Sequence, residues 1–271
     1  MAVQVDHQPT PAEGQLETEQ LELRLLLEGI YRQYGFDFRE YAPSSLKRRV
    51  WRRVHAEGTR TIAGLLDLSI NVTSMFRDPS FYSSLRERVV PLLRTYPFTR
   101  VWVAGCSTGE EVYSLAIVLQ EEGLYERTRI YATDINEAVL ERAREGVFPL
   151  DKMKEYTENY IAAGGQRSFS EYYLAKYQGA LFDRALTENV VWAPHNLVQD
   201  RSFNTFNLVL CRNVMIYFDR TLQTRVHQLF YDSLERLGVL ALGHKESIRF
   251  TGFEDRYEEL DPAEKLYRKV R

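Results

Sequence analysis

The chain has 271 residues, of which 44% are hydrophobic and 27% charged, a composition typical of a soluble globular protein of one or two domains. The formal net charge of −3 gives no overall attraction to nucleic acid, and the presence of only two cysteines argues against a disulfide framework. No apolar run reaches membrane-spanning length, no signal-peptide pattern is present, and no cysteine–histidine spacing suits zinc. We therefore expect a cytoplasmic protein without a metal site and without membrane insertion.

The N-terminal part is predicted to be a disordered tail followed by a small helical domain. Residues 1–20 are polar and contain two prolines and a glycine, so this segment has little to bury. Helical patterns dominate residues 21–80. "LELRLLLEGIYRQYG" is amphipathic, and "APSSLKRRVWRRVHAEG" has Ser44 or Ser45 as its N-cap and Gly58 as its stop.

The second of these helices separates apolar from charged side chains. At about 100° per residue, the apolar side carries Leu46, Val50, Trp51 and Val54. The opposite side carries Arg48, Arg49, Arg52 and Arg53. This pattern indicates a docked helix whose positive face is either ordinarily solvated or binds an acidic partner helix. Nucleic acid is a weaker alternative, because the rest of the chain is acidic.

Residues 81–271 are predicted to form an α/β domain. "DPSFYSSLRERVVPLLRTY" is typical of a helix kinked near Pro91. The strand-like runs "RVWVAG", "RIYATD", "VVWAPHN", "FNLVLCRN" and "GVLALGH" come after it, several separated by helical segments, which favours a parallel sheet covered on both faces. "EKLYRKVR" suggests a final edge strand. "EYYLAKYQGALFDRAL" does not fit the alternation and predicts a hairpin, turning at Gln178-Gly179, in an inserted β-subdomain at about 165–188.

The first strand leads through a small-residue loop into a helix, in "VWVAGCSTGEEVYSLAI". Ligands of open α/β sheets bind at the carboxyl ends of strands, where this loop lies. With only Gly105 and Gly109 it is neither a G-x-G-x-x-G fingerprint nor a P-loop. Glu110 and Glu111 follow at the helix N-terminus, where the dipole favours their charge but where they would repel a phosphate. The loop therefore suits a ligand with an ammonium or sulfonium group.

Asp134 ends the second strand, in "RIYATDIN". A carboxylate at this place can accept both hydroxyls of a ribose. A ribose without phosphates, together with a positive group, indicates S-adenosylmethionine. The alternative is structural: Glu110 and Glu111 would only complement the helix dipole, and Asp134 would only cap the next helix.

Six blocks of the sequence resemble a known family, the CheR-type chemoreceptor glutamate O-methyltransferases. They are "LKRRVWRR", "NVTSMFRD", "GCSTGEEVYSLA", "TDINEAVLERAREGVF", "FNLVLCRNVMIYFD" and "LGHKES", spread over about residues 36–247. The resemblance implies a helical N-terminal domain and a Rossmann-like methyltransferase domain with a small inserted β-subdomain. It also implies methyl transfer from S-adenosylmethionine to receptor glutamates, leaving S-adenosylhomocysteine and glutamyl methyl esters that tune sensory adaptation.

The resemblance also assigns roles to single residues. Those expected to bind the cofactor are Asn71, Thr73, Arg77, Gly105, Glu110, Glu111, Asp134, Asn196, Leu197, Arg212 and Asn213. Arg77, Arg212 and Tyr217 are expected at the reacting end, and the arginine face of the helical domain is expected to bind the substrate. The implied partner is the cytoplasmic helical region of a chemoreceptor, bound by a monomer.

The expected reaction requires no dedicated base. A glutamate with a reference pKa of about 4.3 is already ionised at neutral pH and is itself the nucleophile. His195, His244, Cys106 and Cys211 are therefore interpreted as structural residues. Two alternatives remain: a methyltransferase for another carboxylate or a small molecule, and a regulatory module that binds the cofactor without turnover.

Overall fold

The computed structural model describes residues 73–176 and 179–271, together with separate positions between residues 23 and 48. Asn71, Arg49, Arg52 and Arg53 therefore lie outside the described residues, as do the predicted tail and most of the first two helices. The chain divides into two compact units, Met1–Leu68 and Ser69–Arg271. In the first unit the described positions of the arginine-rich helix are helical, with Leu46 buried and Arg48 exposed. This difference in exposure agrees with the prediction that the helix has an apolar side and a charged side.

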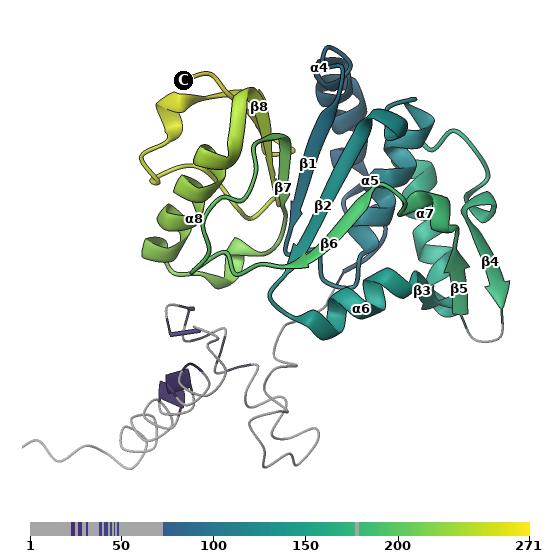
Figure 1. Cartoon of the computed structure of the whole chain (residues 1–271), viewed down its shortest axis with the longest axis horizontal. Coiled ribbons are helices and arrows are strands. Elements are labelled where there is room, and N and C mark those ends of the chain that lie inside the picture. Colours follow the sequence, from purple (N-terminus) through teal and green to yellow (C-terminus); the bar gives the residue numbers. More distant parts are fainter. Residues whose placement is uncertain are drawn as a thin grey trace, which may run out of the picture. The chain divides into compact units, whose positions relative to one another are not determined.

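The second unit is built on a seven-stranded sheet with the order β6-β2-β1-β7-β8-β10-β9 (Figure 1). Its strands are β1 (Thr99–Ala104), β2 (Thr128–Asp134), β6 (Val190–Pro194), β7 (Phe206–Cys211), β8 (Leu234–Leu242), β9 (Tyr257–Asp261) and β10 (Leu266–Lys269). The first five strands in this order are parallel, and β10 and β9 are antiparallel to their neighbours. The strand order reverses between β1 and β7, so the loops after these strands lie where an open α/β sheet binds its ligand.

The far edge of the sheet differs from the prediction. The segment "EKLYRKVR" does form a strand, β10, but β10 lies between β8 and β9 and is not an edge. The edge is β9, whose sequence YEELD carries three acidic residues and was not recognised as a strand. Charged side chains are common on edge strands because they discourage further pairing. The sheet is therefore mixed rather than entirely parallel.

The helices begin with a continuous but irregular stretch, α3 (Pro79–Ser84), η2 (Leu85–Val89) and α4 (Val90–Leu93). The middle part is a π-turn, in which the Val90 amide bonds to the Leu85 carbonyl immediately before Pro91. The predicted irregularity near Pro91 is thus confirmed, since proline cannot donate to the preceding turn. Among the helices that the structure describes, none is long and apolar enough to cross a membrane.

The remaining helices connect the strands. α5 (Glu110–Glu121) follows β1, α6 (Glu137–Glu145) follows β2, and α8 (Arg220–Ser233) leads into β8. The Asn136 side chain caps α6 by accepting the Ala138 amide at 2.9 Å, and Asp219 caps α8 by accepting the Leu222 amide at 2.9 Å. Short 3-10 turns complete the connections: η3 (Tyr125–Arg127), η4 (Leu150–Lys152), η5 (Phe169–Tyr172), η6 (Arg184–Leu186), η7 (Met215–Tyr217) and η8 (Glu254–Arg256).

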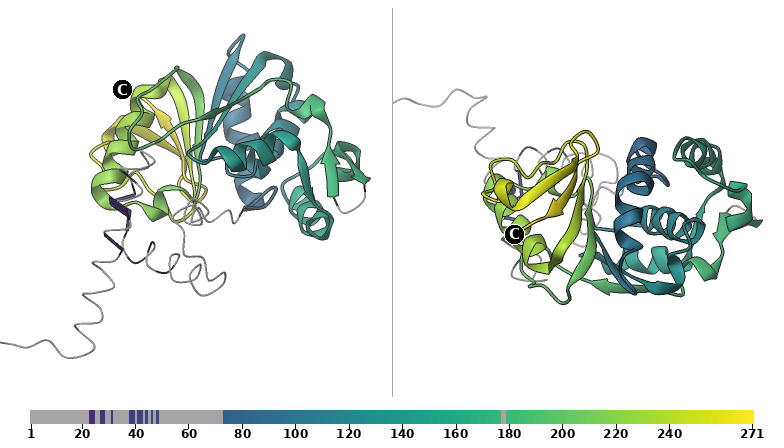
Figure 2. Two further views of the ribbon diagram at one scale, coloured as in Figure 1. Left: turned by 60° about the horizontal axis from the view of Figure 1, so that its bottom comes forward. Right: turned by 90° about the horizontal axis from the view of Figure 1, so that it is seen from above.

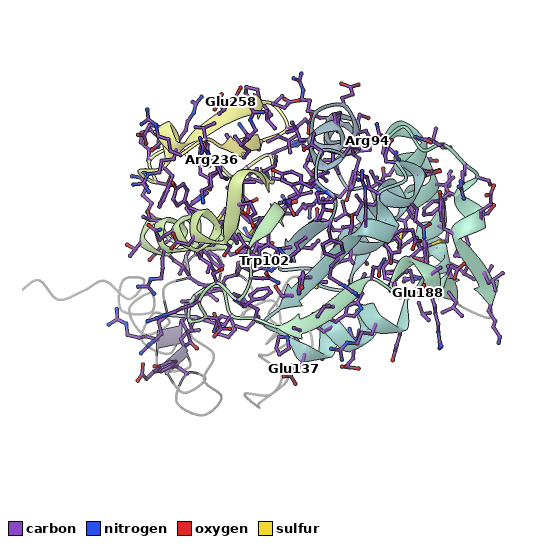
Figure 3. All side chains as sticks on the ribbon, turned by 45° about the horizontal axis from the view of Figure 1, so that its top comes forward. Arg94, Trp102, Glu137, Glu188, Arg236 and Glu258 are labelled. Atoms are coloured by element: carbon purple, nitrogen blue, oxygen red, sulfur yellow. The ribbon has the colours of Figure 1, made fainter. Side chains whose placement is uncertain are left out.

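The core forms where the central strands meet α5. Every residue of β7 is buried, and β1 is buried except for Arg100. Trp102 of β1 is fully buried, and its indole N–H donates to the Thr133 hydroxyl at 2.8 Å. Figure 3 shows Trp102 in the interior of the unit, while the labelled charged side chains lie at the periphery. The strands are therefore held rigidly beneath the loops at their carboxyl ends.

A small antiparallel sheet is inserted between β2 and β6. The predicted hairpin is confirmed as β4 (Tyr173–Lys176) paired with β5 (Gly179–Phe182), with residues 177–178 outside the described part. Gly179, which the prediction placed in the turn, is instead the first residue of β5 and pairs with Lys176. A third strand, β3 (Val147–Pro149), pairs with β5, and helix α7 (Met153–Ala162) follows it. Figures 1 and 2 show this insertion at the end of the unit opposite the C-terminal strands.

The carboxylate of Glu121 joins the insertion to the main sheet domain. It accepts hydrogen bonds from the Tyr160 hydroxyl at 2.5 Å, the Tyr172 hydroxyl at 2.9 Å and the Gln166 amide at 3.0 Å, and it pairs with Arg86. Burial alone would raise the pKa of Glu121, but these four donors outweigh it and lower the pKa below its ordinary value. One buried carboxylate thus fixes α5, α7 and the loop before η5 to one another.

We expect Glu121→Gln to lower the free energy of unfolding at pH 7 by about 2 kcal/mol. A carboxylate accepts hydrogen bonds at both oxygens, whereas the side-chain amide of glutamine has one oxygen and one N–H₂ group that can only donate. Since folding lowers the pKa of Glu121, its stabilisation is complete above the unfolded-state pKa and is lost as pH falls through the folded-state value. Urea unfolding of wild type and variant from pH 7 to pH 3 measures the difference. A difference that stays constant over that range would show that the ionised carboxylate is not what holds the insertion.

Candidate functional site

The loop after β1 is shaped by contacts with the end of β2. The amides of Gly105 and Cys106 both donate to the Thr133 carbonyl, at 2.8 and 2.9 Å. Gly105 has a φ of 75°, and a Cβ at this position would lie 2.5 Å from a methyl group of Val214. Only glycine therefore fits here, and the loop comes close to the segment that follows β7.

Asp134 lies half-buried at the end of β2, beside this loop. One carboxylate oxygen accepts the Ser107 amide at 2.9 Å, and the other accepts the Asn136 amide at 3.0 Å. Burial raises the pKa of Asp134, and the backbone donors partly oppose that rise. Asn136, not Asp134, supplies the side-chain cap of α6. Asp134 is thus oriented by backbone amides on both sides of the turn.

Two further residues expected to bind the cofactor, Asn196 and Leu197, lie near Asp134. The His195 amide donates to the Asp134 carbonyl at 3.0 Å, which places the segment after β6 against the end of β2. The Asn196 side chain accepts the Val198 amide at 2.9 Å, and Leu197 is buried. Asn196 and Leu197 therefore lie on a tight turn that borders the same loop region as Asp134.

The two glutamates at the start of α5 have different surroundings. Glu110 is 6% exposed, accepts the Thr108 hydroxyl at 2.7 Å, and has its pKa raised by burial. Glu111 is less buried and forms an ion pair with Arg212 at 2.8 Å. Only Glu111 is therefore tied to the reacting end that the sequence predicted.

Arg212, at the end of β7, is the centre of a buried charged cluster. Its Nη1 bonds to Glu111 at 2.8 Å and its Nη2 to Asp78 at 2.8 Å, while both nitrogens lie 3.3 Å from the Arg77 carbonyl. The guanidinium stacks on Phe81, 3.9 Å from the ring centroid. Its Nε is buried without a hydrogen-bond partner among the described residues. Arg212, which is expected at the reacting end, therefore holds two acids in place.

Sequence reasoning did not identify Asp78. It has the left-handed φ of 58° and precedes Pro79, the first residue of α3. His244 Nδ1 lies 3.9 Å from its carboxylate, and His244 Nε2 bonds to Glu264 at 2.8 Å. The only signal in the sequence was its place at the end of the block "NVTSMFRD", directly after Arg77.

The segment before α3 is fixed to two helices. The Phe76 amide donates to Ser114 of α5 at 2.9 Å, the Ser74 hydroxyl to Glu155 of α7 at 2.7 Å, and the Asn159 side chain to the Met75 carbonyl at 3.1 Å. This segment carries two of the predicted cofactor residues, Thr73 and Arg77, and both are half-buried. Arg77 is brought to Arg212 through its carbonyl oxygen.

Asn213 and Tyr217 lie on the loop between β7 and α8. Asn213 has a left-handed φ of 62°, and Tyr217 ends the 3-10 turn η7. The amides of this loop are held by a buried carboxylate, Glu246, which sequence reasoning also missed. It belongs to the quoted block "LGHKES", but nothing in that block indicates which residue makes contacts.

The histidines and cysteines fit structural roles. The His195 ring contacts Trp102 edge to face, with the ring centroids 5.1 Å apart, and burial lowers the pKa of His195. Cys106 and Cys211 are buried free thiols whose pKa values are raised by burial, which disfavours the reactive thiolate. No group of His, Cys, Asp and Glu side chains in the described part of the chain is arranged to hold a metal ion.

These features fit the expected cofactor. The half-buried Asp134 carboxylate is of the type that accepts ribose hydroxyls, and Glu110 and Glu111 place two carboxylates at the start of α5, where Glu111 is paired with Arg212. The amides of Gly105 and Cys106 are already bonded to the Thr133 carbonyl, so these two backbone donors are not available to a phosphate.

Comparison with known proteins identifies the family. Residues 71–264 match the sequence model described as "CheR methyltransferase, SAM binding domain", and residues 21–68 match "CheR methyltransferase, all-alpha domain". The chain is 47% identical to Cher3 of Pseudomonas putida over 92% of this chain and 97% of that protein. It is 31% identical to a chemotaxis protein methyltransferase of Listeria monocytogenes, over 81% of this chain and 87% of that one, and 29% identical to one of Salmonella typhimurium, over 83% of each. The chain thus has a Rossmann-like S-adenosylmethionine-dependent methyltransferase fold, with S-adenosylmethionine as its cofactor, and it belongs to the CheR methyltransferase family.

Proposed function

We propose that the chain transfers methyl groups from S-adenosylmethionine to glutamate side chains of a chemoreceptor, and so takes part in chemotactic adaptation. The observation that carries this proposal is the match of both family segments, because relatives aligned over most of the chain are named chemotaxis protein methyltransferases. The products are glutamyl methyl esters and S-adenosylhomocysteine.

The residues of the site suit this reaction. The bound cofactor supplies an electrophilic methyl group on its sulfonium. The chain must bring an ionised carboxylate to it, align that carboxylate and exclude water. Arg77 and Tyr217 are proposed to orient the carboxylate through charge-assisted hydrogen bonds. Arg212 fixes Glu111 and Asp78 around the reacting end and keeps its Nε–H available.

The product is expected to be a methyl ester, because a carboxylate needs no base and an amine acceptor would need one. With labelled S-adenosylmethionine and receptor membranes, mild alkali should release most of the protein-bound label as volatile methanol. Label that survives the alkali would indicate a nitrogen or carbon acceptor. Absence of label in the receptor, with intact cofactor binding, would support a regulatory module instead.

The arginine-rich helix of the first unit is proposed to recognise the acidic partner helix. Arg48 is exposed while Leu46 on the same helix is buried, which agrees with a charged outer side. Arg49, Arg52 and Arg53 are assigned to that side from the sequence pattern. Charges at the rim of an interface act mainly on the encounter rate and on its sensitivity to salt.

Reversing two of these charges, in the double variant Arg49→Glu and Arg53→Glu, should slow receptor methylation by about tenfold or more at low salt. Cofactor affinity should not change. The wild-type rate should fall as salt rises, because exposed charges are screened beyond about 8 Å at physiological ionic strength.

The matched control is Arg236→Glu with Arg249→Glu, which changes the net charge equally at two exposed positions of the second unit. Initial rates with receptor membranes at several salt concentrations distinguish the two variants. Equal rates in both would mean that overall charge, not the arginine face, governs the encounter.

A further inference from the structure

The loop between β7 and α8 is held by one buried carboxylate, that of Glu246. One oxygen accepts the amides of Asn213 at 2.9 Å and Gly243 at 2.6 Å. The other oxygen accepts the amides of Met215 at 2.7 Å and Ile216 at 3.3 Å. Glu246 is 5% exposed, so these four amides, not water, satisfy it.

This arrangement requires an ionised carboxylate. All four partners are N–H donors, and two of them point at each oxygen. A protonated acid or an amide would place its own hydrogen against two donors, whichever way it turned. Burial raises the pKa of Glu246, and the four backbone donors oppose that rise by stabilising the charged form. Four hydrogen bonds of this kind compensate for the cost of removing the charged carboxylate from water.

The surrounding chain is shaped to receive this carboxylate. Gly243 follows β8, and its carbonyl accepts the Glu246 amide at 2.8 Å, which turns the side chain back toward the loop. A Cβ on Gly243 would lie 2.8 Å from both the Asn213 amide nitrogen and a Glu246 oxygen. Asn213 itself has a left-handed φ of 62°, an uncommon conformation for a residue other than glycine, which the carboxylate helps to maintain.

We propose that Glu246 is a positioning residue for methyl transfer: its carboxylate fixes the backbone of residues 213–216 and so places Arg212, Asn213 and Tyr217 at the reacting end. Glu246 itself does not need to touch the cofactor or the substrate. This inference rests on the proposed function of the loop residues, and it adds the group that holds them.

The test compares two isosteric variants, Glu246→Gln and Glu121→Gln. Both remove the charge from a buried carboxylate with four hydrogen-bond donors, but Glu121 holds the insertion and lies outside the proposed reacting end. Both variants should lower the midpoint of thermal unfolding. Only Glu246→Gln should reduce kcat at saturating cofactor, by about tenfold or more, as expected for one lost charge-assisted interaction.

A double-mutant cycle separates positioning from general loosening. If Glu246 acts by placing Tyr217, the kcat penalty of Glu246→Gln should shrink to about twofold in a Tyr217→Phe background. If Glu246→Gln lowers kcat by the same factor in the wild type and in the Tyr217→Phe variant, the inference is overturned. So would a kcat loss no larger than that of Glu121→Gln.

If the wild type methylates no receptor, the proposed function fails. Cofactor binding, which needs no methyl transfer, then still tests the inference. Calorimetry should show that Glu246→Gln binds S-adenosylhomocysteine about fivefold or more weakly than Glu121→Gln does. Hydrogen exchange of the Asn213 and Met215 amides with solvent should also be faster in Glu246→Gln. Equal affinities and equal exchange would overturn the inference independently of activity. If the glutamine variant does not fold, Glu246→Asp, which keeps the charge but withdraws it by one methylene, is expected to show the same changes to a smaller degree.

Discussion

Replacing Arg212 by methionine should lower the free energy of unfolding by about 3 kcal/mol, a typical cost of removing one partner from a buried ion pair. The side chain of Arg212 is 2% exposed and pairs with both Glu111 and Asp78, so the variant leaves two carboxylates facing each other without a cation. Methionine can still pack on Phe81, which isolates the loss of charge from a loss of volume. Methyl transfer should also be abolished, because both acids border the reacting end.

The control for this variant is Arg88→Met. Arg88 also faces a carboxylate, Asp261 at 3.4 Å, but its side chain is 52% exposed. An exposed pair of this kind contributes about 0.5 kcal/mol or less. Urea unfolding of both variants measures the contrast. Equal losses of unfolding free energy in the two variants would contradict the view that burial makes the Arg212 cluster important. A stable Arg212→Met variant with full activity would show that Arg212 is not part of the site.

The parts of the fold that sequence reasoning identified are those with a strong local pattern. The strand–loop–helix around Gly105 and the hairpin of β4 and β5 could be predicted because each has a clear local pattern of apolar residues and turn residues. β3 was missed because it has only three residues and ends in proline, too short for any alternation. β9 was missed because acidic residues dominate its sequence, a feature of its edge position rather than of its backbone.

The candidate site shows the same division. Glu111 and Asp134 could be proposed from the sequence because they stand at fixed places relative to predicted strands. Asp78 and Glu246 were missed because their importance comes from contacts across long stretches of chain, 134 residues from Asp78 to Arg212 and 33 from Asn213 to Glu246. A carboxylate that binds the backbone of a distant loop leaves no periodicity in its own neighbourhood. Such residues become visible only when the topology brings the ends of β7 and β8 together.

Replacing Asp134 by alanine should weaken binding of S-adenosylmethionine and S-adenosylhomocysteine by about 2 kcal/mol or more, roughly thirtyfold in Kd. The variant removes the carboxylate that is proposed to bind the ribose hydroxyls, and the Ser107 amide loses its acceptor. The control is Asp183→Ala, because Asp183 likewise accepts the amide two residues ahead, that of Ala185 at 3.0 Å, but lies exposed on the insertion. Calorimetry should show near wild-type affinity for that control. Unchanged affinity in Asp134→Ala would mean that its carboxylate only shapes the turn before α6.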